Sequence, residues 1–513
     1  MKKTKKVICL AMSTALALSF TGCNNKQKGN GGEKISLKWV FAGNGIQKDS
    51  KAVWAAVNDK IKDYSGLENV NLDIEIFGTN EYAQKFMLMQ TSEEKVDIVQ
   101  TYGLDYPMLA RDDSFISIDD YIKKSKNLKT AFPEWMWDYS LVDGKHYYVP
   151  QYQILTNVDY AFATQKSLSD KYMDAKKAQD TFFNAETFDS SCWDVIENYL
   201  DALSAAGELK RGYLPIGTLD FVFQKGYEAV VPGRFFIKDN DPEHKVYYVD
   251  EIPERKIAYE RVNKFFKKGY IRSDIASATS LNDPIGTENS YTIWHKGTRN
   301  QQYLAKAALA AAETEAKEPL TMLLTKNYDY VPFSNAAGGM AIAKSCENPD
   351  EAFRVIELMN TEEGKDVYNM MVYGFEGKHY NKIDDNIIEP IGYQNQPTSS
   401  ADYGLWKWNV GNTKYAYSTK TEVITPDVFD DANDGPNTVR SKLAGFVFDD
   451  TNVKIELAQI NTVFSEYENF NKGTIDNVES KFAEYIEKIN KAGKDKVIDE
   501  VQKQINEFFK NKK

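Results

Sequence analysis

Aromatic and amide side chains gather in the segment WKWNVGNTKY, which contains Trp406, Trp408, Asn409, Asn412 and Tyr415. Aromatic rings stack on apolar faces, and amides both donate and accept hydrogen bonds in one plane, so this composition favours non-covalent recognition over bond-making chemistry. In an extended segment Trp406 and Trp408 would face the same side. We favour Trp408 as a ligand contact because it adjoins Asn409. The alternative is that one or both rings fill the core, where tryptophan is common.

Further candidates of the same chemical types lie elsewhere in the chain. YQNQP, just before the tryptophans, offers Tyr393, Gln394, Asn395 and Gln396. Glu376 in YGFEGKHY could bond a ligand hydroxyl, or pair with Lys378 or another cation in its loop. The remaining candidate contacts are Asn44, Gln47, Asn80, Tyr82, Tyr102, Asp105, Tyr106, Gln151, Tyr152 and Trp294.

Catalytic signatures are absent from the sequence. It contains neither GxSxG nor HExxH, and its four histidines stand far apart at positions 146, 244, 295 and 379. Cys192 and Cys346 are isolated, so no metal cluster is indicated. We therefore expect a protein that is not an enzyme and needs no metal or cofactor, although abundant Asp and Glu leave carboxylate chemistry open.

The elements that must position these side chains begin with ISLKWVFAG, an alternating strand pattern from Ile35 to Gly43. A helix over 51–64, a strand over 71–78, a helix over 82–90 and a strand over 96–103 follow. This alternation predicts a largely parallel sheet. Ligands of such sheets lie beyond the carboxyl ends of the strands, where three Gly-containing loops are expected. These loops could equally be plain strand-to-helix turns.

The rest of the chain continues the mixture of helices and strands. An Asp143-Gly144 turn predicts a hairpin, NQQYLAKAALAAAETEA predicts an alanine-rich helix, and a strand and helix are expected around GGMAIAKSCENPDEAFRVIELMN. From Lys454 onward the pattern is that of charged amphipathic helices.

The first 22 residues have the layout of a secretory signal. Lys2, Lys3, Lys5 and Lys6 precede an apolar run that is too short to span a membrane. The run ends in Phe20-Thr21-Gly22-Cys23, which resembles the lipobox of bacterial lipoproteins. Phe20 departs from the usual leucine, and the alternative is a signal cleaved elsewhere beside a chance cysteine. We expect cleavage after residue 22, lipidation of Cys23, and a flexible tether over 23–33.

Charge and cysteine content narrow the function further. Loss of the four signal lysines changes the net charge from −12 to −16. A body this acidic disfavours nucleic acid as a partner. The mature chain keeps Cys192 and Cys346, too few for a disulfide framework, and we expect buried thiols, with one bridge as the alternative.

The order of motifs resembles one family. The lipobox, WVFAGNG, YAQKF, VDIVQTYG, VDGKHYYVPQ and GGMAIAKSCENPDEAFRVIELM together look like the extracellular sugar-binding proteins of bacterial ABC importers. The C-terminal part, with YGFEGKHY and WKWNVGN, is similar to large LplA-like lipoproteins whose C-terminal domain is known as DUF3502.

The resemblance implies an α/β, two-lobe, type II-like binding-protein fold with a ligand cleft between lobes joined by hinge strands. The first lobe would take 34–152 plus about 330–386, and the second about 153–329 plus 387–513. It implies capture of a carbohydrate, which we expect to be a neutral oligosaccharide, and delivery to ABC permease subunits. We expect a monomer anchored by its lipid to the outer face of a cell membrane, in a Gram-positive-type cell without an outer membrane.

Two other classes of function stay open on the sequence alone. A secreted glycosidase also combines aromatic residues with paired carboxylates. A receptor for peptides or acidic oligosaccharides would need arginine guanidinium groups that bind carboxylates in a bidentate manner. Arginine is scarce, with Arg211 and Arg234 as local exceptions, so a neutral ligand is favoured.

Overall fold

The structure is a computed structural model of the whole chain, and it describes most of the residues from Lys34 onward. The described residues are 34–155, 158–185, 188–210, 227–231, 233–238, 241–277, 291–298, 313, 316–324, 330–331, 338–393, 396–422, 433–435 and 438–512. None of the helices found there combines the length and apolar character needed to cross a bilayer. The signal and tether segments predicted over 1–33 lie outside the described residues.

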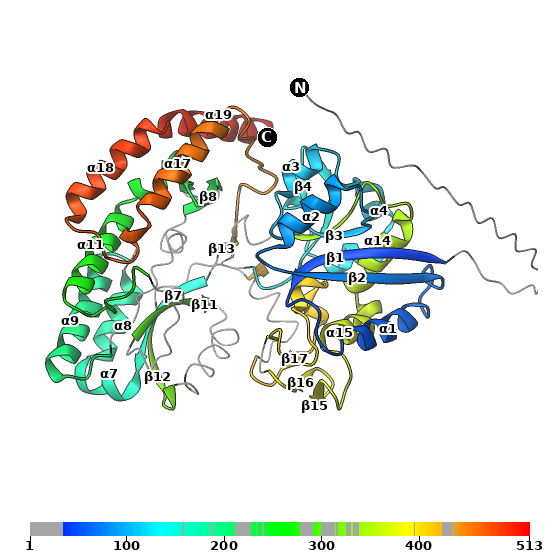
Figure 1. Cartoon of the computed structure of the whole chain (residues 1–513), viewed down its shortest axis with the longest axis horizontal. Coiled ribbons are helices and arrows are strands. Elements are labelled where there is room, and N and C mark those ends of the chain that lie inside the picture. The colour runs from blue at the N-terminus through cyan, green and yellow to red at the C-terminus, as the bar shows by residue number, and fades with distance from the viewer. Residues whose placement is uncertain are drawn as a thin grey trace, which may run out of the picture.

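Two bodies make up the molecule, and the first is built on a five-stranded sheet (Figure 1). The strand order is β2-β1-β3-β14-β6, with β1 parallel to both β2 and β3. β14 is antiparallel to β3 and β6. The sequence therefore predicted the first β-α-β-α-β unit and its parallel pairing correctly, whereas β3 is shorter than expected.

The elements of this first lobe come from two stretches of the chain. The first stretch holds β1 (Ile35–Gly43), α1 (Ser50–Ile61), β2 (Val70–Gly78), α2 (Tyr82–Thr91), β3 (Ile98–Gln100), α3 (Tyr106–Arg111), α4 (Asp119–Lys124), α5 (Lys126–Ala131), α6 (Trp135–Asp138), β4 (Leu141–Val142), β5 (Lys145–His146) and β6 (Tyr148–Pro150). The second holds β14 (Gly339–Ile342), α14 (Pro349–Met359), η2 (Glu362–Gly364), α15 (Lys365–Tyr373), β15 (Tyr380–Lys382), β16 (Ile387–Pro390), η3 (Lys407–Asn409), η4 (Thr413–Tyr415) and β17 (Ser418–Thr419).

The first lobe keeps more of the chain than the sequence indicated. Val53, Val57 and Ile61 of α1 are buried in its main core, as their spacing of four predicts. Tyr403 and Val410 are buried in the same core. The segment from about 387 to 419, which the sequence analysis placed in the second lobe, therefore packs on the first. The physical reason is that its apolar side chains belong to this core, and the Leu405 N–H donates to the carbonyl oxygen of Val372 in α15 at 2.9 Å.

The second body holds the middle of the chain and its C-terminal helices. Its elements are β7 (Val158–Gln165), α7 (Lys166–Tyr172), α8 (Ala175–Asn184), α9 (Ser190–Ala206), β8 (Tyr227–Val231), β9 (Phe235–Lys238), β10 (Val246–Tyr248), η1 (Val249–Glu251), α11 (Pro253–Lys267), β11 (Tyr291–Thr298), β12 (Leu320–Leu324), α17 (Lys454–Glu466), η5 (Glu468–Phe470), α18 (Val478–Lys491) and α19 (Lys494–Asn511).

Two cores support the second lobe. One lies among α8, α9 and α11 beside the β11-β7-β12 sheet. The other lies between the β10-β9-β8 sheet and the last helices, where Val497, Val501 and Ile505 of α19 are buried at spacings of four. The amphipathic helices predicted after Lys454 are confirmed, and they complete a core instead of forming a separate module.

The chain passes from one lobe to the other three times: after β6, before β14 and after β17. The described parts of these crossings are 151–155 for the first, 330–331 and 338 for the second, and 420–422, 433–435 and 438–453 for the third. Asn433 of the third crossing is fully buried and joins it to the first. Its amide donates to the carbonyl oxygen of Gln153 at 2.8 Å and accepts from the Leu155 N–H at 2.8 Å. β13 (Tyr330–Val331) and β18 (Val439–Arg440) pair in parallel between the two bodies (Figure 1).

The two described cysteines belong to different cores. Cys192 is buried in the second lobe, and Cys346 packs against the core of the first. No disulfide joins them.

Candidate functional site

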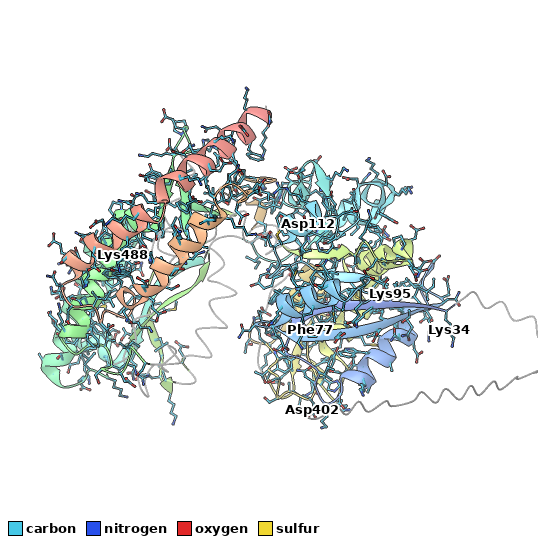
Figure 2. All side chains as sticks on the ribbon, turned by 45° about the horizontal axis from the view of Figure 1, so that its top comes forward. Lys34, Phe77, Lys95, Asp112, Asp402 and Lys488 are labelled. Atoms are coloured by element: carbon cyan, nitrogen blue, oxygen red, sulfur yellow. The ribbon has the colours of Figure 1, made fainter. Side chains whose placement is uncertain are left out.

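The carboxyl ends of the first lobe's parallel strands point toward the second lobe. Figure 2 shows Lys34, just before β1, on the outer side of this lobe, and Phe77, near the end of β2, on the side facing the other body. Because β3 runs parallel to β1, the loop that follows β3 opens on the same side. This is the edge where α/β sheets place their ligands.

Three aromatic rings form a cluster at this edge, which we call the ring cluster: Tyr102, Trp406 and Trp408. The tryptophan rings stack with centroids 5.4 Å apart and planes 15° apart. Tyr102, 45% exposed, meets Trp408 edge to face at 5.2 Å. Both tryptophans are half-buried. An aromatic surface that stays partly open beside a sheet edge can stack against an apolar ligand face.

Buried amides hold the ring cluster in place. Asn409 donates to the carbonyl oxygen of Ala42 at 2.6 Å and accepts from the Gln100 amide at 2.6 Å. Gln100 also accepts from the Ala42 N–H at 2.9 Å. Gln151 donates to the carbonyl oxygen of Trp408. The turn that carries the tryptophans is thus bonded to the ends of β1 and β3 and to the first crossing.

Gln100 and Asn409 are positioning residues. The sequence analysis noted Asn409 in WKWNVGNTKY without choosing it as a contact, and it did not single out Gln100. Both are buried, so they act through the backbone that they hold. A signal was present for Gln100, because it is a polar residue in the otherwise apolar end of the strand VDIVQ. A buried amide in a strand requires partners.

Several predicted contacts have core roles in this structure. Tyr82 is 1% exposed and donates to the carbonyl oxygen of Gln100 at 2.5 Å. Tyr106 stacks edge to face on Tyr148 at 5.0 Å. Tyr152 is buried in the main core, and its carbonyl oxygen accepts from Thr413. Burial raises the pKa of Tyr106 to about 12, as expected for a phenol removed from water.

Three predicted amide contacts make hydrogen bonds to backbone groups inside the first lobe. The Gln47 amide donates to the carbonyl oxygen of Thr398 at 2.9 Å and accepts from the Gly404 N–H at 2.9 Å. Asn44 donates to the carbonyl oxygen of Pro397 at 2.6 Å. Asn412 is fully buried and donates to the carbonyl oxygen of Ala131 at 3.1 Å. Gln47 and Asn412 are buried, and Asn44 is half-buried.

Other candidates are exposed and lie in loops or at a helix end. Asn80 lies in the loop after β2, and Asp105 is the N-cap of α3. Glu376 is exposed, and its expected partner Lys378 instead pairs with Asp49 at 2.8 Å. Hydrogen bonds from Lys378 and His379 lower the pKa of Asp49 to about 2.

The structure describes the remaining three predicted contacts only in part. Tyr393 is half-buried, and its hydroxyl has no hydrogen-bond partner within the described part of the chain. The backbone of Trp294 in β11 pairs with that of Ala161 in β7, and the Trp294 side chain lies outside the description. Gln394 is also outside the described residues.

Lys407 at the ring cluster and two arginines elsewhere in the first lobe are paired with carboxylates. Lys407, between the two tryptophans, pairs with Glu422 at 2.6 Å, and both side chains are largely covered. Of the first lobe's arginines, Arg111 pairs with Asp143, and Arg354 pairs with Glu357 and Glu363. Across the described ranges no group of three or more His, Cys, Asp or Glu residues could hold a metal ion.

Comparison with known proteins finds similarity to proteins of carbohydrate transport. Residues 442–510 match the family model described as a domain of unknown function, DUF3502. A carbohydrate ABC transporter substrate-binding protein of Streptococcus pneumoniae serotype 4 is 25% identical over 99% of this chain and 97% of its own length.

Solved structures agree in fold. The crystal structure of the N-glycan transport solute binding protein NgtS from Streptococcus pneumoniae matches with a TM-score of 0.74 at 22% identity, over 94% of this chain and 100% of that one. The same protein in complex with Man5GlcNAc matches with a TM-score of 0.65, at the same identity and coverage. The chain has the two-lobe fold of extracellular solute-binding proteins. It is a homologue of carbohydrate ABC transporter substrate-binding proteins and carries a DUF3502 domain, as the resemblance implied.

Proposed function

We propose that this protein captures a neutral oligosaccharide between its two lobes and delivers it intact to the permease of an ABC importer. The observation that carries the proposal is the ring cluster, which lies at the sheet edge facing the second lobe and is joined by Gln151 to the first crossing. Aromatic faces match the apolar faces of sugar rings. Because the site lies beside the crossings, ligand binding there can be coupled to closure of the two lobes.

The charge balance supports a neutral ligand. An acidic sugar would need an unpaired cation, best an arginine fork. Lys407, the basic residue inside the ring cluster, is paired with Glu422, which leaves no net charge to attract a carboxylate. The NgtS complex with Man5GlcNAc makes mannose- and N-acetylglucosamine-containing oligosaccharides the first ligands to test.

We also propose that Cys23 carries a lipid that holds the protein on the outer face of the cell membrane. The Phe20-Thr21-Gly22-Cys23 sequence and the polar stretch after it support this proposal. Burial of an acyl chain contributes about 0.8 kcal/mol per CH₂, and more than one chain is needed for stable anchoring. Metabolic labelling of the full chain with a palmitate analogue should mark the wild type and not C23S, and equal labelling of both would contradict the anchor.

The decisive experiment combines binding with product analysis. The protein from Lys34 onward is titrated with Man5GlcNAc and a panel of oligosaccharides, first by thermal shift and then by calorimetry. At 100 times its Kd a ligand should stabilise the fold by about 2.7 kcal/mol. We expect every bound sugar to be recovered intact. Shortened sugars would identify a glycosidase instead, and stabilisation by peptides alone would exclude a sugar receptor.

A further inference from the structure

A large groove lies at the C-terminal end of the last helix, away from the ring cluster. It has a cavity volume of about 1040 Å³ and is bounded by the β9–β10 turn, the residue Lys442 after β18, and the second half of α19. We call it the α19 groove. Figure 1 shows the C-terminus, where α19 ends, at the top of the molecule beside the first lobe.

The α19 groove is basic in a protein whose net charge is −12. Lys245, Lys442, Lys510 and Lys512 line it, against a single carboxylate, Glu243. Lys512 has an internal role, because its ammonium donates to the carbonyl oxygens of Lys442 at 3.1 Å and Ala444 at 3.0 Å. This fixes the end of α19 to the third crossing.

The other three lysines differ from their neighbours. Along the same C-terminal helices, Lys488 and Lys496 each pair with a carboxylate. Lys245, Lys442 and Lys510 form no ion pair with any carboxylate that the structure describes, and all three are exposed. Three like charges on one concave surface repel one another, so an anion between them would be stabilised.

The walls of the α19 groove are fixed and partly aromatic. The rings of His244 and Phe509 pack with centroids 3.9 Å apart. Gln502 accepts from the Val246 N–H at 3.0 Å and donates to the carbonyl oxygen of His244 at 3.2 Å. The turn and the helix are therefore bonded into one surface. Lys245 lines the groove, and its ammonium lies 5.3 Å from the centre of the Tyr247 ring.

We propose that the α19 groove binds a phosphate-bearing organic molecule, with Lys245, Lys442 and Lys510 around the phosphate and the Phe509 wall against the organic part. A lysine ammonium is a compact point charge, which suits an anion with several oxygens such as phosphate. Bidentate recognition of a planar carboxylate is instead the role of the arginine guanidinium. A cavity of this volume is in the range of small-molecule sites and exceeds what a lone phosphate would fill. The phosphate could belong to a soluble metabolite or to a lipid headgroup.

A favourable interaction with the dipole of α19 does not explain why three lysines line the α19 groove. A cation in the last turn of a helix is stabilised by the carbonyl groups there, which explains Lys510. Lys245 and Lys442 come from a hairpin turn and a crossing segment, so they have no such role.

The test uses two probes, glycerol 3-phosphate by calorimetry and vesicles of phosphatidylglycerol in phosphatidylcholine by co-sedimentation. The variant carries K245Q, K442Q and K510Q, and the charge-matched control carries K51Q, K171Q and K176Q, at exposed lysines of other elements. We expect wild type and control to bind one or both probes, and the variant to bind at least about tenfold more weakly.

Each outcome has a definite meaning. Binding of glycerol 3-phosphate supports a soluble ligand, and binding of the vesicles alone supports a headgroup. No binding of either probe, or equal weakening in the control, would overturn the proposal. Melting temperature and oligosaccharide affinity, measured on the same samples, should be equal in all three proteins. These readouts separate loss of the groove from misfolding and from failure of the proposed sugar site.

Discussion

At the scale of single residues, Trp408 is the side chain on which the proposed sugar site depends most. It is the middle ring of the ring cluster, stacked on Trp406 and met edge-on by Tyr102. Trp408→Ala removes the partner of both other rings. We expect oligosaccharide affinity to fall by about 2 kcal/mol, or roughly 30-fold, in calorimetry. Trp137→Ala, a partly buried tryptophan on α6 that stacks on Phe132, is the matched control and should leave affinity unchanged.

Glu197 gives a residue-scale prediction on pH. Burial acts to raise its pKa, but hydrogen bonds from Lys264 and Lys268 outweigh it and lower the pKa to about 2. The lowered value means that these bonds stabilise the fold fully above the ordinary pKa of 4.5, and the contribution is lost as pH falls toward 2.

Glu197→Gln should therefore lower the free energy of unfolding by about 1–3 kcal/mol at pH 7. The difference from wild type should shrink between pH 4.5 and 2, measured by urea unfolding at several pH values. Glu260→Gln removes only an exposed pair with Lys256 and should have little effect at any pH. A Glu197→Gln difference independent of pH would show that charge is not its origin.

At the scale of elements, a buried polar network joins the DUF3502 helices to the second lobe. Asp250 of η1 accepts from Arg255 at 3.2 Å, from Tyr259 at 2.7 Å and from Tyr485 of α18 at 2.6 Å. Arg255 is fully buried on α11. The segment that matches DUF3502 is thus held to the rest of the second lobe by charged hydrogen bonds as well as by apolar packing.

Arg255→Met should destabilise the protein by about 3–5 kcal/mol, because it leaves the Asp250 carboxylate buried without its cation. The double variant Arg255→Met/Asp250→Leu should recover part of this loss, since no uncompensated charge remains. Chemical unfolding measures both, and limited proteolysis between β18 and α17 reports whether the C-terminal helices detach. Equal stability of wild type and Arg255→Met would show that the network contributes nothing.

Elements were easier to predict from the sequence than the site. β1 and α1 carry regular apolar periods, and such periods depend only on which face is buried. The loops that contain the candidate contacts have no apolar periodicity, so the sequence does not show which of their side chains are buried. Tyr82 and Gln47 have side-chain types that can bind sugars, yet they turn inward and donate hydrogen bonds to backbone carbonyl groups. The segment over 387–419 was misassigned because its packing partner, α15, is set by tertiary structure alone.

At the scale of the whole molecule, the two-lobe architecture bears on how a ligand would be held. A site between lobes favours the state in which both lobes contact the ligand, and the crossings bonded through Asn433 offer a hinge.

We therefore expect the protein to become more compact when it binds its oligosaccharide. Small-angle scattering should give a smaller radius of gyration with saturating ligand than without it. Trp408→Ala at the same sugar concentration should show less compaction, because the closed state gains less from the ligand. An unchanged radius of gyration in wild type, with calorimetry confirming saturation, would mean that the ligand is held by one lobe alone. Recognition by the permease would then have to use a surface that does not depend on closure.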